Sequence, residues 1–130
     1  MKKTASNITK VTPVLIVDAV EPCLPFWRDA LGYAVRAEVP HEKTLGFALL
    51  ENAAGEVMLQ SKASLAGDLP AVAELRPDSV LFVEVRSLEA ARKAASDCKV
   101  LVADRTTFYG MRETVVLDPG GTVVIFAEPA

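Results

Sequence analysis

The sequence is poor in the residues that bind metals and form disulfides. Its 130 residues include one histidine and two cysteines, and no C-x-x-C spacing occurs. Cys23 and Cys98 lie far apart in the chain, and neither has a histidine nearby in sequence. These absences argue against a zinc-binding or thioredoxin-type motif. We expect both cysteines to be buried free thiols, since free cysteine packs as a small hydrophobic residue.

An excess of positive charge is also absent. Lysine and arginine number 14 against 17 acidic residues, giving a formal net charge of −3. The sequence therefore predicts no basic surface for nucleic acid or anionic membranes. The longest strongly apolar run, residues 11–20, is interrupted by Thr12, Pro13 and Asp18. It is far shorter than the roughly 20 residues that span a bilayer, so we expect no membrane insertion.

The first ten residues, MKKTASNITK, lack the apolar segment of a secretory signal. We interpret residues 1–10 as a flexible lead-in and expect a cytoplasmic protein. A hydrophobic fraction of 51% is ordinary for a globular domain. The length is that of one compact domain.

Short β-strands and one helix dominate the first half of the chain. Residues 11–20 are β-rich, and Val20, Leu24, Trp27 and Leu31 then recur at helical spacing before Gly32. This spacing predicts a short amphipathic helix. Three strands follow, separated by the turns PHEK and NAAG, at residues 33–39, 44–51 and 56–61.

The second half repeats this order after a connector, residues 63–76, in which we expect about one helical turn. Ser87 is placed to cap a helix through LEAARKAASDCK. The expected strands are residues 79–85, 99–104, 110–118 and 121–128. Two βαβββ modules, residues 11–62 and 77–128, predict an α+β fold with one cupped mixed β-sheet.

Three motifs resemble the vicinal oxygen chelate superfamily, which includes glyoxalase I, the bleomycin-resistance proteins and the extradiol dioxygenases. They are PFWRDALGY, FYGMRE and DPGGTVVIFAE, and the resemblance covers residues 11–128. It is strongest toward the bleomycin-resistance branch. The resemblance implies paired βαβββ modules, and it implies dimers, which are common in this superfamily.

The resemblance also locates four positions where metal-dependent members hold a divalent cation. In this sequence they fall at Thr12, Leu59, Val80 and Ile125, and the register of the second position leaves Met58 or Gln60 as alternatives. Aliphatic side chains offer no lone pairs, and a divalent cation needs several N, O or S ligands. We therefore expect no metal and no other cofactor.

A mostly apolar concavity with a few polar groups is typical of a small-molecule site. We expect Arg112 and Glu113 to supply polar groups there. Arg112 has a second interpretation, a surface ion pair with Glu113 or Asp118. The candidate lining residues are Phe47, Leu49, Leu59, Val80, Phe82, Phe108, Tyr109 and Ile125.

Other candidates keep structural interpretations. His41, in the PHEK turn, is interpreted as a solvated turn residue rather than a general base. Phe26 and Trp27 are expected to pack the first helix on the sheet. Phe108 and Tyr109 precede Gly110 in a loop, where binding residues often occur. The sequence assigns no catalytic residue.

The sequence thus predicts a metal-independent homodimer that sequesters a small hydrophobic or aromatic molecule. The alternative is a metal-dependent lyase, isomerase or dioxygenase of the same superfamily. Exposed strand edges are the physical reason to expect a dimer, because pairing would cover them.

Overall fold

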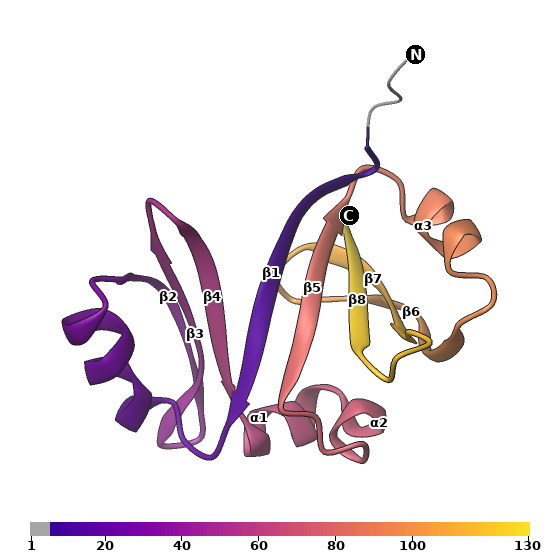
Figure 1. Cartoon of the computed structure of the whole chain (residues 1–130). Coiled ribbons are helices and arrows are strands. Elements are labelled where there is room, and N and C mark those ends of the chain that lie inside the picture. The colour runs from indigo at the N-terminus through magenta and orange to yellow at the C-terminus, as the bar shows by residue number, and fades with distance from the viewer. Residues whose placement is uncertain (1–5) are drawn as a thin grey trace. The chain divides into compact units, whose positions relative to one another are not determined.

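The computed structural model describes residues 6–130 (Figure 1). The first half of the proposed lead-in, residues 1–5, lies outside the described residues. Strand β1 already begins at Ile8 and runs to Val17, so residues 8–10 are strand rather than lead-in. The chain divides into two compact units: residues 12–80, the N-terminal unit, and residues 81–130 with the start of β1, the C-terminal unit.

The N-terminal unit has the strand order β2-β3-β4-β1. β1 and β4 are parallel, with Val14 opposite Met58, and the other neighbours are antiparallel. The bounds of its further strands are β2 Ala34–His41, β3 Thr44–Asn52 and β4 Gly55–Ser61. These strands match the three predicted from sequence to within two residues.

The C-terminal unit repeats the pattern with the order β5-β8-β7-β6. Its strands are β5 Ser79–Val85, β6 Lys99–Thr106, β7 Met111–Leu117 and β8 Val123–Pro129. Helix α3, Leu88–Ala94, stands between β5 and β6 and packs on β7 and β8 (Figure 1). The predicted α+β class, a mixed sheet with few helices built from two βαβββ repeats, is confirmed.

The first helix is not the regular α-helix that the spacing predicts. A 3₁₀ turn, η1 Glu21–Cys23, leads into a π-helical segment, η2 Pro25–Ala30. Pro25 has no N–H to donate, which breaks the regular ladder. The Leu31 N–H then bonds the Phe26 carbonyl five residues back, at 3.0 Å. This altered winding leaves Leu31 45% exposed, although it was expected on the apolar face.

The connector holds more helix than expected. It forms two short helices, α1 Lys62–Asp68 and α2 Pro70–Ala73. The Ser61 side chain caps α1 by accepting the Ser64 N–H at 3.1 Å, and Pro70 suits the first turn of α2. Leu65 and Val72 are buried, so tertiary packing stabilises helices that Gly67 and Pro70 disfavour in isolation.

Each unit buries one face of its strands under its helix. In the N-terminal unit, Val20 and Leu24 join a helix-side core with alternate residues of β3 and β4, namely Ala48, Leu50, Val57 and Leu59. In the C-terminal unit, Leu88 and Ala91 of α3 pack with Val83 and Val85 of β5. Because side chains alternate along a strand, the intervening residues occupy a second, helix-free face.

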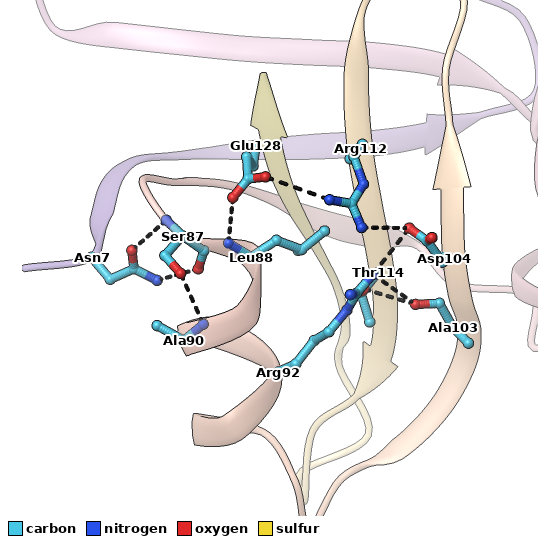
Figure 2. A network of polar contacts seen from close by, with 10 residues as sticks. All are labelled: Asn7, Ser87, Leu88, Ala90, Arg92, Ala103, Asp104, Arg112, Thr114 and Glu128. Atoms are coloured by element: carbon cyan, nitrogen blue, oxygen red, sulfur yellow. Dashed lines mark hydrogen bonds and ion pairs between the residues drawn. The ribbon is translucent and has the colours of Figure 1, made fainter. Parts of the chain in front are cut away.

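Polar contacts fix α3 against its strands (Figure 2). Ser87 accepts the Ala90 N–H at 3.0 Å, which confirms the predicted cap, and the Glu128 carboxylate accepts the Leu88 N–H at 2.7 Å. Arg92 donates to the Thr114 hydroxyl at 2.7 Å and to Asp104 at 3.0 Å. One helix is thereby tied to β6, β7 and β8.

Replacing Ser87 with alanine should therefore lower the free energy of unfolding by about 1 kcal/mol, because α3 loses its N-cap acceptor. Urea denaturation measures this change. Ser96→Ala is the control, since Ser96 is exposed and its hydroxyl bonds none of the described residues. Equal stability of the two variants would contradict the role of the cap.

Candidate functional site

The helix-free face of the C-terminal unit is built from alternate residues of four strands. β7 places Glu113 opposite Ala127 and Val115 opposite Ile125, and β6 places Arg105 opposite Glu113. Paired residues of neighbouring strands project from the same face. Phe82 lies on this face too, because Leu81 and Val83 on either side of it pack with α3. Most of the face is hydrocarbon, with the buried Glu113 carboxylate within it.

Glu113 is completely buried. The Arg105 Nε donates to its Oε1 at 2.9 Å, and the Tyr109 hydroxyl donates to its Oε2. The Nη2 atom of Arg105 lies 3.4 Å from the hydroxyl oxygen of Tyr109. A buried carboxylate is costly unless it is paired and hydrogen-bonded, and these three residues, the Glu113 cluster, meet that requirement.

Tyr109 is held as a neutral phenol. Burial and the hydrogen bond to Glu113 raise the pKa of Tyr109 far above its ordinary value. At neutral pH the hydroxyl is therefore a donor. A proton-accepting role for Tyr109 is disfavoured, because its phenolate would lie beside the Glu113 carboxylate.

Two phenylalanine rings pack against the Tyr109 ring. The Tyr109 ring lies edge-on to Phe108, with centroids 5.2 Å apart, and to Phe82 at 6.4 Å. Phe108 is 81% exposed, and Tyr109 is 44% exposed although its hydroxyl reaches a fully buried carboxylate. The loop that joins β6 to β7 thus carries one exposed ring and one ring anchored on the helix-free face. Three aromatic rings and a polar cluster meet here, as in many small-molecule sites.

Arg112, predicted as a polar handle beside Glu113, lies on the opposite face of β7. Its guanidinium approaches Asp104 at 3.5 Å and Glu128 at 3.9 Å, on the side that faces α3 (Figure 2). Consecutive residues of a strand project to opposite faces, so Arg112 and Glu113 do not share one site. Arg112 thus forms ion pairs, as its second interpretation predicted, but its partners are Asp104 and Glu128 rather than Glu113 or Asp118.

In the N-terminal unit the helix-free face is also largely apolar. Phe47 lies opposite Gln60, and Leu49 opposite Met58, on β3 and β4. Both Phe47 and Leu49 are partly buried there. Thr12, Val14 and Ile16 of β1 share this face, because the intervening Leu15 and Val17 pack into the helix-side core.

Leu59 requires a correction. It is fully buried in the helix-side core of the N-terminal unit, facing away from Phe47 and Leu49. The alternative registers, Met58 and Gln60, occupy the helix-free face instead. Side chains alternate between the two faces of a strand, so an error of one residue in the register places the predicted side chain on the wrong face. Leu59 is therefore a core residue and not a lining residue.

The side chains at the resemblance-derived metal positions do not fit a divalent cation. Val80 and Ile125 supply no donor atom, and Thr12 supplies one neutral hydroxyl. Gln60 adds one amide, whose nitrogen already donates to Ser64 at 3.2 Å. Residues 6–130 contain no group of three histidine, cysteine, aspartate or glutamate residues arranged to hold a metal. A divalent site needs more and better donors than these.

A separate pocket of about 380 Å³ lies at the end of β1 in the N-terminal unit. Leu65 and Ala66 supply apolar wall, and Lys62 and Asp78 supply charge, but Lys62 is paired with Asp18 at 2.8 Å. None of the sequence-predicted site residues lines it. The complete lining is Ile16, Lys62, Leu65, Ala66, Ala73, Arg76, Pro77 and Asp78.

The remaining candidates have structural places. His41 ends β2 and is partly buried against Gly46, where a Cβ added to the glycine would lie 2.7 Å from the His41 Cβ. Trp27 packs on the helix-side core, as expected, whereas Phe26 is 57% exposed. Cys23 and Cys98 are free, as expected, but only partly buried.

Solved structures of similar fold cover most of the chain. A glyoxalase/bleomycin resistance protein/dioxygenase superfamily member from Vibrio splendidus 12B01 is 22% identical, with a TM-score of 0.67 over 92% of this chain and 97% of that one. Methylmalonyl-CoA epimerase from Mycobacterium tuberculosis is 20% identical, with a TM-score of 0.68 over 99% and 93%. A Bacillus halodurans protein is 15% identical, with a TM-score of 0.73 over 96% of each chain. No family model and no curated protein sequence matches the chain.

These likenesses define the class of fold. The chain has the glyoxalase/bleomycin resistance protein/dioxygenase fold, in agreement with the superfamily resemblance of its motifs. At these identities the likeness concerns the fold, and function depends on the particular residues of this chain.

Sequence reasoning missed Arg105. It lies in the run ADRTTF at the end of β6, and its partner Glu113 is eight residues away across the β6–β7 hairpin. Pairing the two strands from the Phe108–Gly110 turn would bring Arg105 and Glu113 together. The irregular register of β6 between Val102 and Arg105 obscures this pairing in the sequence.

Replacing Tyr109 with phenylalanine should lower the free energy of unfolding by about 1–2 kcal/mol, because a buried carboxylate loses a donor. Tyr33→Phe is the matched control, since its hydroxyl bonds none of the described residues. Urea denaturation at pH 7 measures both. Equal losses would contradict the anchoring role of Tyr109.

A comparison of wild type with Tyr109→Phe tests the raised pKa of Tyr109. A group whose pKa rises on folding stabilises the protein below its unfolded pKa, here about 10, and that stability is lost at higher pH. Wild-type stability should therefore fall more steeply above about pH 10 than that of Tyr109→Phe. Parallel curves up to the alkaline limit of folding would contradict the assignment.

Proposed function

We propose that this protein binds a small hydrophobic or aromatic molecule without a metal ion, as a sequestering protein. The observation that carries the proposal is the composition of its helix-free faces. They present mostly hydrocarbon where metal-dependent members of the superfamily present ligands, and the buried polar group on this face of the C-terminal unit is the Glu113 cluster.

Binding energy would come chiefly from apolar burial, at about 25 cal/mol per Å² of surface. Phe82 and Tyr109 offer ring edges and faces to a flat ligand, and exposed Phe108 extends this surface outward. The neutral Tyr109 phenol and the Arg105 guanidinium would orient polar groups of the ligand. Arg112 has no part in this proposal, because it pairs with Asp104 and Glu128 on the α3 side.

The proposal also covers the cellular location and the oligomeric state of the protein. Among residues 6–130 no helix is long and apolar enough to cross a bilayer. We propose a cytoplasmic homodimer, because β2 and β6 each end the strand order of a unit and their free edges favour pairing. The enzymatic alternative, a metal-dependent lyase, isomerase or dioxygenase, would need donor atoms that the resemblance-derived positions lack.

Native mass spectrometry of the purified full-length protein tests these points together. We expect a dimer mass and an organic adduct that is released on denaturation, without stoichiometric metal. Stoichiometric zinc, nickel, iron or manganese would overturn metal independence. A monomer at micromolar concentration would overturn the dimer.

A binding variant gives a second test. Phe82→Ala should weaken binding of 2-naphthol, a flat aromatic probe, because it removes one wall of the aromatic site, and Phe26→Ala is the control because Phe26 is an exposed ring of the N-terminal unit. Losing a buried aromatic contact should lower affinity about tenfold. Probe fluorescence measures both variants, and equal affinities would contradict the proposed location.

A further inference from the structure

The pocket at the end of β1 is lined only by residues of the N-terminal unit, and the proposed function makes no use of it. Its volume of about 380 Å³ falls at the lower end of small-molecule sites, which span about 300–1,000 Å³. Ile16 of β1, Leu65 of α1 and Ala73 of α2 supply apolar wall. Ile16 and Leu65 are buried, and the Ile16 N–H donates to the Asp78 carbonyl at 2.9 Å, so these walls are held in place without a ligand.

Two cations and one acid accompany the apolar wall. The Lys62 Nζ already pairs with the Asp18 Oδ1 at 2.8 Å. The Arg76 guanidinium, in contrast, forms no ion pair or hydrogen bond with the described residues, although Asp78 lines the same pocket two residues away. An arginine carries five donors in a planar fork that matches a carboxylate. Arg76 is therefore a cation of the pocket lining that is available to a bound anion.

The backbone of Arg76 is also unusual. Its φ of 50° lies in the left-handed region, which glycine adopts readily and which a residue with a Cβ disfavours. The Arg76 N–H donates to the Ala73 carbonyl at 3.0 Å, so the residue stands in the turn after α2, where glycine commonly takes this conformation. Side chains held in such strained conformations cluster at ligand-binding sites. The presence of arginine here thus indicates a use for its side chain.

We propose that this pocket is a second binding site, for a small monocarboxylate with an apolar body. The Arg76 guanidinium would bind the carboxylate, and the wall that includes Ile16 and Leu65 would cover the hydrocarbon. A dianion is disfavoured, because Asp78 adds negative charge to the lining and Lys62 is already paired. This site shares no residue with the aromatic site of the C-terminal unit, so either site can exist without the other.

Titration of the isotope-labelled full-length protein with hexanoate, followed by its amide chemical shifts, tests the site. We expect saturable shifts at pocket residues such as Leu65 and Ala73, and none at Phe82 or Tyr109. Hexan-1-ol has the same chain length without the charge, and acetate has the charge without the chain. Both should bind at least about tenfold more weakly than hexanoate, because each lacks one of the two interactions.

Three variants separate binding from structure. Arg76→Gln should weaken hexanoate about tenfold, because charge-assisted hydrogen bonds are lost. Arg36→Gln is the control, since it removes the same charge from an exposed arginine of β2 outside the pocket, and it should leave the affinity unchanged. Arg76→Gly also removes the guanidinium but suits the left-handed backbone. It should bind as weakly as Arg76→Gln and have a Tm about 2 °C above that of Arg76→Gln.

Each failure overturns a separate step. Absence of saturable shifts in the pocket, or shifts at Phe82 and Tyr109 alone, would overturn the site. Equal affinity of wild type and Arg76→Gln, or equal weakening by Arg36→Gln, would overturn the role of Arg76. Equal binding of hexan-1-ol would overturn the carboxylate, and equal binding of acetate would reduce the site to ion pairing only. A Tm of Arg76→Gly below that of Arg76→Gln would overturn the strain. None of these outcomes bears on the aromatic site, which 2-naphthol tests by itself.

Discussion

The alternation of side chains along each strand is the constraint on which the rest of this structure depends. It sends one set of residues under a helix, as with Leu50 and Leu59 in the N-terminal unit, and the other set to a helix-free face. In the C-terminal unit it separates Arg112, which pairs on the α3 side, from Glu113, which lies buried on the other face. The face on which each candidate site residue lies is therefore decided by its position along the strand as much as by its residue type.

Because side chains alternate along the strands, several features of the fold could be predicted from the sequence. Most strands have an apolar pattern, and glycine or proline marks several of the turns, so strand existence, the repeat and the Ser87 cap were predictable. The motif resemblance and the solved structures then agree on the fold. The register of a strand is harder to predict than the presence of the strand. A shift of one residue put Leu59 on the wrong face, and the irregular pairing near Arg105 hid the partner of Glu113.

Helical segments were predicted less well, and for a physical reason. Backbone hydrogen bonding and tertiary packing, rather than the apolar spacing, decided the winding near Pro25 and the two helices after Ser61. Leu31 is exposed because the π-helical turn rotates it away from the expected face. The spacing of apolar side chains predicts that a helix forms, but it does not determine which backbone hydrogen bonds form within that helix.

The polar groups that the fold buries are the features that apolar packing alone would not require. Glu113 is stabilised by two donors, whereas Thr12 has none among the described residues. Glu113 is thus satisfied within the protein, whereas the described residues do not satisfy the Thr12 hydroxyl.

Difference electron density from crystals of the protein, grown after purification without chelator, tests the central claim most directly. We predict density for an organic molecule against the helix-free face of the C-terminal unit, with a polar group near the Glu113 cluster, and no coordinated ion. A compact peak ringed by nitrogen or oxygen donors at metal-coordination distance would contradict the claim.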